Sequence, residues 1–217
     1  MAERLCFLVN DNNSVEEVYV NFTFVKGMAF SQKVKCAQSL AEAINNQFPH
    51  LKHLEVSTKS QNELGKQLSA FNLMYGQYSV ESVFQSSKVF VDGTQYGFII
   101  DYKPLDAKKY VKENQKGGLI KFRFNGVDYP INPKSAFYDW IYINALNKSI
   151  YAEEVIEYDV FSDIEFNDKK SINCQARAVA IYVSITRTGK KEYYLSNFNH
   201  FIELYKNTME GQISLFE

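Results

Sequence analysis

The chain has 217 residues and a net charge of −1, with 46% hydrophobic residues but only 4 prolines and 10 glycines. This composition excludes a disordered or low-complexity protein and supplies enough apolar side chains for a core. The near-neutral charge argues against a surface that binds nucleic acid nonspecifically over its whole extent.

Residues 1–60 are predicted to form a small β-α-β extension. Residues 18–25 alternate between apolar and polar side chains, which is the pattern of a half-buried strand. A helix with an apolar stripe follows, for which Ser31 is the expected N-cap, and a short strand is expected at 53–57.

Residues 61–217 are predicted to form a second, mostly helical domain, so the fold class is α+β. Alternating runs at 119–124 and 127–131 flank Asn125-Gly126, a strong signal for a β-hairpin. Several further segments have helical patterns: 79–90, 136–147 after a capping Ser135, 152–159 and 200–207. Periodicity leaves 173–185 open between a helix and a strand, because β-branched residues interrupt it.

Two features bear on the compartment. The cysteines Cys6, Cys36 and Cys174 are odd in number and far apart, so no disulfide framework is expected, and free thiols are typical of a reducing compartment. We find neither a signal-peptide pattern nor an apolar run near the roughly 20 residues that span a bilayer. A cytoplasmic protein without a membrane partner is therefore expected.

Positive charge is concentrated between residues 103 and 123, where seven Lys or Arg residues face two acidic ones. Such a surplus can contact phosphates, but a solvated surface insertion is the more common explanation for it. Standard cofactor motifs are not found: the chain has no Gly-rich phosphate loop, no G-x-S-x-G and no His or Cys spacing suited to zinc. We therefore expect no metal and no cofactor.

The segment 79–90 carries the strongest chemical pattern. Ser79 can cap the helix and place Glu81 in its first turn, where the helix dipole favours an anion. Gln85 and Lys88 follow within about 40° of Glu81 around the helix. The long side chains of Glu81 and Lys88 can therefore converge on a sugar-sized ligand. The same residue types also commonly form a solvated face, so the pattern by itself leaves both readings open.

These residues also resemble a known family. S-V-E-S-V-F-Q-S-S-K-V-F at 79–90 is similar to the S-x-E-H-x-Y-Q-x-x-K-F signature of the NADAR superfamily. L-S-A-F at 68–71 resembles the family's L-S-N-F. D-I-E at 163–165 and N-C-Q-A-R at 173–177 fall where the family has its acidic and N-x-L-G…R elements.

The blocks F-Q-S-S-K-V-F, A-F-Y-D-W-I-Y-I-N-A-L-N and K-K-S-I-N-C-Q-A-R resemble, more closely, NADAR proteins encoded beside DarT-type DNA ADP-ribosyltransferase toxins. The resemblance covers about residues 60–187. The chain departs from the family pattern at Ser82, where the family has His, and at Ala70, where it has Asn, although Asn72 follows. The usual Trp-Gly pair after the acidic element is absent.

The resemblance implies an enzyme that removes ADP-ribose from guanine bases in DNA and so acts as an antitoxin. Its implied partners are ADP-ribosylated DNA and the cognate DarT-type toxin. We expect Lys88 to be the nucleophile and Glu81 to carry protons or stabilise positive charge. The other expected substrate contacts are Ser69, Phe71, Asn72, Gln85, Asp139, Trp140, Glu165, Asn173 and Arg177.

Several of these residues have an alternative role. Phe71 can stack on a base or pack in the core, as can Trp140, and Gln85 can be a surface amide. Arg177 can bind a pyrophosphate or pair with Asp139 or Glu165. Two other functions also stay open: an N-glycosidase for a small metabolite such as a riboflavin-pathway intermediate, and a non-catalytic module that binds ADP-ribose or the toxin.

Overall fold

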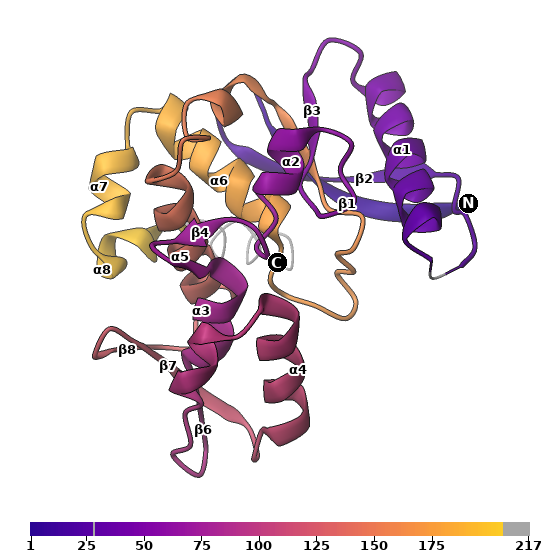
Figure 1. Cartoon of the computed structure of the whole chain (residues 1–217). Coiled ribbons are helices and arrows are strands. Elements are labelled where there is room, and N and C mark those ends of the chain that lie inside the picture. The colour runs from indigo at the N-terminus through magenta and orange to yellow at the C-terminus, as the bar shows by residue number, and fades with distance from the viewer. Residues whose placement is uncertain (28, 206–217) are drawn as a thin grey trace, which may run out of the picture.

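The computed structural model describes residues 1–27 and 29–205 and confirms the predicted α+β class (Figure 1). The strands are β1 (Ala2–Val9), β2 (Val15–Phe22), β3 (His53–Glu55), β4 (Met74–Tyr75), β5 (Tyr78–Ser79), β6 (Lys88–Phe90), β7 (Leu119–Phe124), β8 (Val127–Tyr129) and β9 (Val160–Ser162). The α-helices are α1 (Phe30–Gln47), α2 (Glu63–Gln67), α3 (Val80–Ser86), α4 (Pro104–Asn114), α5 (Ala136–Asn147), α6 (Gln175–Arg187), α7 (Lys191–Leu195) and α8 (Phe198–Phe201). Two 3-10 turns, η1 (Gly97–Asp101) and η2 (Glu154–Glu157), complete the described elements.

The N-terminal strand β1 is a feature that the sequence pattern did not predict. It is buried on both faces: Leu5 and Phe7 belong to the main core, whereas Cys6 packs against α1. Its apolar residues therefore run on without alternation, as is typical of strands covered on both sides. β1 pairs with β2 in an antiparallel hairpin, and β2 is the strand predicted near 18–25.

The helix α1 covers one face of this hairpin (Figure 1). It begins at Phe30, and Ala29 occupies the N-cap position, so the prediction of Ser31 as the cap is wrong. The side chain of Gln32 instead accepts a hydrogen bond from the backbone N–H of Ala29, at 3.1 Å, which satisfies one of the unpaired groups at the helix start.

The main sheet combines strands from both sides of residue 60. Its order is β2-β1-β9-β3, so β9 lies between β1 and β3. β9 runs antiparallel to β1 and parallel to β3. This pairing places the segment that follows β9, residues 163–175, next to the segment that follows β3.

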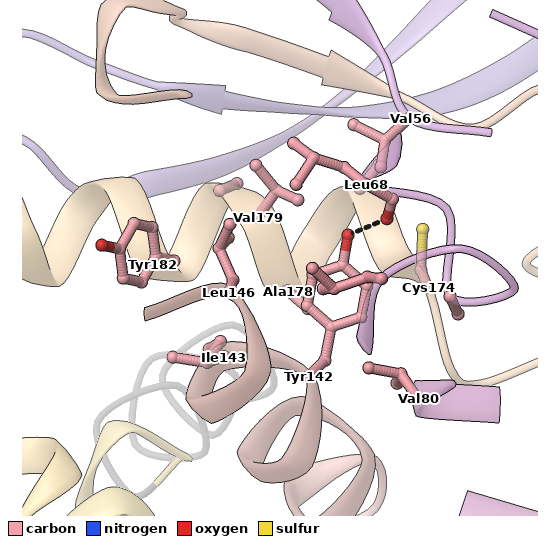
Figure 2. Close-up of a cluster of buried hydrophobic side chains, with 14 of the residues drawn as sticks. Val56, Leu68, Val80, Tyr142, Ile143, Leu146, Cys174, Ala178, Val179 and Tyr182 are labelled. Carbon is pink, nitrogen blue, oxygen red and sulfur yellow. Dashed lines mark hydrogen bonds between the residues drawn. The ribbon is translucent and has the colours of Figure 1, made fainter. Parts of the chain in front are cut away.

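The main core lies between this sheet and the helices α5 and α6. Figure 2 shows Leu146 and Tyr142 of α5 among Val179 and Ala178 of α6. The buried hydroxyl of Tyr142 donates a hydrogen bond to the carbonyl oxygen of Leu68, which ties α5 to the loop after α2 (Figure 2). The pattern at 173–185 is compatible with a helix or a strand. In the structure most of this segment belongs to the helix α6, which packs one apolar stripe into the core.

A smaller sheet, β6-β7-β8, packs beside α3 and α4 (Figure 1). The predicted hairpin around Asn125-Gly126 is confirmed, and both residues have the positive φ that such a turn requires. Two helix predictions need correction. Ser135 occupies the N-cap position of α5 but makes no capping hydrogen bond, because its backbone has a positive φ and not the extended conformation that aims a capping side chain at the helix. The segment 152–159 forms only the short 3-10 turn η2.

The end of the chain agrees in part with prediction. The helix expected at 200–207 corresponds to α8 and the residues after it, of which 206–207 lie outside the described part.

Candidate functional site

Two hydrogen bonds hold the first turn of the helix α3 in place, one with its N-cap residue and one with the loop after α2. The hydroxyl of Ser79 accepts a hydrogen bond from the backbone N–H of Ser82 at 3.1 Å, which confirms Ser79 as the N-cap. The backbone N–H of Glu81 donates to the carbonyl of Ala70 at 2.9 Å. All seven residues of α3 are buried. The face that carries Glu81 and Gln85 is therefore not a solvated helix surface.

Lys88 lies beyond the end of this helix, on β6, so the prediction of one helix over 79–90 is wrong. The hydroxyls of Ser86 and Ser87 both donate to the carbonyl of Val83, at 3.1 and 2.7 Å. The backbone N–H of Ser87 donates to the same carbonyl at 3.1 Å, so three donors share this acceptor at the end of the helix. Lys88 then starts the strand, opposite Phe122 of β7.

The amine and the carboxylate nevertheless share one polar chain. The Nζ of Lys88 donates to Oε1 of Gln85 at 2.8 Å, and Nε2 of Gln85 donates to Oε1 of Glu81 at 2.8 Å. The amine of Lys108, from α4, lies 3.7 Å from the same Glu81 oxygen. Gln85 thereby links the two side chains and restricts their orientation.

The environment of Lys88 favours its neutral form. Burial and, to a smaller extent, the nearby Lys108 cation together lower the pKa of Lys88 from 10.5 to about 8, against the opposing effect of Glu81. The amine also lies 4.8 Å from the centre of the Phe84 ring. An amine with this pKa can be neutral, and hence nucleophilic, near neutral pH.

A cavity of about 660 Å³ surrounds these groups, a size typical of small-molecule sites. It lies where α3 and α4 face the segment 163–175 and the loop after β3 (Figure 1). Seven of the predicted site residues line it: Ser69, Phe71, Glu81, Gln85, Lys88, Glu165 and Asn173. The fold thus brings together four segments that are distant in sequence.

The remaining predicted residues do not line this cavity. Asn72 is exposed, and its amide donates to the carbonyl of Lys66 at 2.8 Å. Trp140 packs against Phe198 and Phe201, with ring centres 5.8 and 5.3 Å away.

Asp139 and Arg177 form an ion pair away from the cavity. Asp139 is fully buried, and its Oδ2 accepts hydrogen bonds from Arg177 and from the Tyr205 hydroxyl. Burial raises the pKa of Asp139, while the Arg177 charge opposes this rise. This is one of the two arrangements that the sequence left open for Arg177, and it satisfies the requirement that a buried acid has a partner.

Several cavity residues were not predicted as site residues. Asp163 is the most notable, because its carboxyl is buried and lines the cavity. Burial and the neighbouring Glu55 carboxylate raise the pKa of Asp163 to about 8. Glu55 is itself bound by Ser57, Ser162 and the backbone N–H of Ile164. Asp163 belongs to the acidic D-I-E element, which was the available signal for it.

Gln175 was also missed, and it holds two cavity walls together. Its Oε1 accepts from the backbone N–H of Ala70 at 2.8 Å, and its Nε2 donates to the carbonyl of Val56 at 2.7 Å. Lys108, Thr58 and Lys59 also line the cavity. Lys108 belongs to the basic segment 103–123, which was the available signal for it, whereas Thr58 and Lys59 reach the cavity through contacts between distant segments.

Within residues 1–27 and 29–205, no group of three or more His, Cys, Asp and Glu side chains is arranged to hold a metal ion. Over the same range, no helix is both long and apolar enough to cross a membrane.

Comparison with known proteins gives one family. The model of a family described as the DarT1-associated NADAR antitoxin matches residues 2–214, and so includes the first 60 residues. No curated protein matches the chain.

Proposed function

The chain belongs to the DarT1-associated NADAR antitoxin family, and we propose that it is an ADP-ribosyl-guanine glycohydrolase that reverses the modification of DNA by a DarT-type toxin. The observation that carries this proposal is the Glu81–Gln85–Lys88 chain inside a ligand-sized cavity. A protein that only sequestered the toxin would have no need of a buried amine with a lowered pKa.

The reaction is the cleavage of the bond between ribose C1 and the exocyclic nitrogen of guanine. When the sugar ring opens, C1 becomes an aldehyde-level carbon that a neutral amine can attack. The Nζ of Lys88 forms a bond to C1, the bond to the guanine nitrogen breaks, and the guanine amine leaves with a proton. Water then adds to the Schiff base, which releases ADP-ribose and regenerates the amine.

Two carboxyl groups are available to carry the protons. Glu81 is connected to Lys88 through Gln85. Asp163 lines the same cavity with a pKa of about 8, so it is protonated at neutral pH and can donate to the leaving amine. Other enzymes likewise use the local environment to shift pKa values, so that a proton donor and a base are both available at the same pH.

The experiment is mass analysis of an oligonucleotide that carries ADP-ribosylated guanine, after incubation with the purified protein. We expect release of ADP-ribose and recovery of unmodified guanine. Borohydride reduction during turnover should trap an adduct on Lys88. If the protein cleaves a small ribosylated metabolite but not the oligonucleotide, the proposal of a DNA substrate is wrong. If an inactive Lys88→Met variant still protects cells from the toxin, the protein is a binding module.

A further inference from the structure

Glu165 occupies a position between two cavities. It lines the main cavity together with Thr58 and Lys59. It also lines a neighbouring cavity of about 250 Å³ together with Lys33 and Arg4. Its carboxylate can therefore face either space by a change of side-chain rotamer.

Donors that line the main cavity bind this carboxylate. Lys59 Nζ lies 3.3 Å from Oε2, and the Thr58 hydroxyl lies 3.4 Å from the same oxygen. Lys33 Nζ lies 2.8 Å from Oε1. Burial raises the pKa of Glu165, but the hydrogen bonds and charges of Lys33 and Lys59 outweigh it and hold the pKa below its ordinary value. The carboxylate is thus an internal anion at the cavity wall.

The Lys59 amine and the Thr58 hydroxyl, which bind the Glu165 carboxylate, have other contacts that hold them in place. The Lys59 side chain is only 12% exposed, and its Nζ donates to Thr58 Oγ1 at 2.5 Å. The same amine lies 4.8 Å from the centre of the Phe30 ring. These contacts hold the ammonium group at the cavity wall when the carboxylate leaves.

The smaller cavity offers a place for the displaced carboxylate. The guanidinium of Arg4 lines it, and the Nε of Arg4 is buried without a hydrogen-bond partner. A buried donor of this kind is rare in folded proteins. Lys33 can remain paired with Glu165 throughout, because it lines the same smaller cavity.

We propose that Lys59 and Thr58 form an anion subsite for the diphosphate of ADP-ribose, and that Glu165 occupies this subsite until the ligand displaces it toward Arg4 and Lys33. An ammonium group and a hydroxyl are good donors for phosphate oxygens. A diphosphate and a carboxylate cannot share them, because the two anions repel each other. This inference rests on the proposed function for the identity of the ligand, and its test is independent of catalysis.

The probe is ADP, which carries the diphosphate without the ribose that reacts, and binding is measured by calorimetry. Lys59→Met should weaken ADP binding at least about tenfold, the range of a charge-assisted hydrogen bond. Glu165→Gln should tighten it about threefold, because the competing ion pair is worth a fraction of a kcal/mol. Adenosine binding should change in neither variant.

Lys52→Met is the matched control, since Lys52 pairs with Glu157 at 3.2 Å on the exposed surface. It should bind ADP as the wild type does. Wild-type affinity for ADP in Lys59→Met, or weakened binding in Glu165→Gln, would overturn the proposal. If Lys59→Met fails to fold, the sign of the Glu165→Gln effect still decides. Loss of glycohydrolase activity alone would contradict only the proposed function, because ADP binding does not require Lys88.

Discussion

The pH dependence of Lys88 gives the sharpest test of the mechanism. With a pKa of about 8, about a quarter of the Lys88 amines are neutral at pH 7.5, against about one in a thousand at the ordinary value of 10.5. Burial thus raises the reactive fraction by roughly two hundredfold. The rate should rise with pH up to about 8, and fall about tenfold per pH unit below about pH 7.

Lys108 provides a way to move this profile without touching the nucleophile. Its cation lowers the pKa of Lys88. In Lys108→Met the pKa of Lys88 should increase, so the acidic limb of the kcat/KM profile should move to higher pH. Lys109→Met is the matched control, because Lys109 is on the same helix but pairs with Glu113 at 3.9 Å and does not line the cavity.

The assay is the release of ADP-ribose from a modified oligonucleotide between pH 5.5 and 9, with borohydride trapping at each pH. Lys88→Met should lose at least about a thousandfold in kcat/KM, since it removes the nucleophile. Substantial activity in Lys88→Arg would refute the reasoning, because a guanidinium stays charged and forms no Schiff base. An acidic limb that stays unchanged in Lys108→Met would refute the assignment of that limb to Lys88.

Three other groups give further predictions. Gln85→Leu should lower kcat with little change in KM, because Lys88 and Glu81 lose the amide that orients them; steady-state kinetics on the oligonucleotide check this. The wild-type rate should fall above about pH 8, where Asp163 loses the proton that it donates, and Asp163→Asn should abolish this fall. Because the folded state raises the pKa of Asp163, the wild type should lose stability from about pH 4 to pH 8, and the melting temperature of Asp163→Asn should fall less over that window. Asp139→Leu should destabilise the fold by about 3–5 kcal/mol in denaturant unfolding, and Asp139→Leu with Arg177→Met by much less, because a lone buried charge costs more than none. Equal losses in the single and double variants would contradict the pairing.

Local signals in the sequence were sufficient for features that depend on a few neighbouring residues. The cap at Ser79, the position of Glu81 in the first turn and the Asn125-Gly126 hairpin are all local and were all predicted correctly. The same rules failed in part at Ser135, which occupies the N-cap position of α5 but, with its positive φ, makes no capping hydrogen bond. They failed again at β1, because a strand buried on both faces lacks the alternation that identifies a strand.

The meeting of Glu81 and Lys88 was expected from helical spacing, and it occurs for a different reason. The helix ends at Ser86, and Gln85 connects the two groups across the start of β6. Spacing on an ideal helix could not reveal this, because it assumes that the helix continues to Lys88, whereas Lys88 pairs with Phe122 of β7.

By itself, the sequence determined which chemical groups are present and which of them are neighbours along the chain. Only the tertiary structure decided how far each group is removed from water. Asp163 has a raised pKa because the fold buries it and because β9 pairs with β3 and so places it beside Glu55, about a hundred residues earlier in the chain. Glu165 likewise meets Lys33 and Lys59, which are distant in sequence. Desolvation and charge act over distance in space, so the properties of these groups depend on contacts that no local pattern encodes.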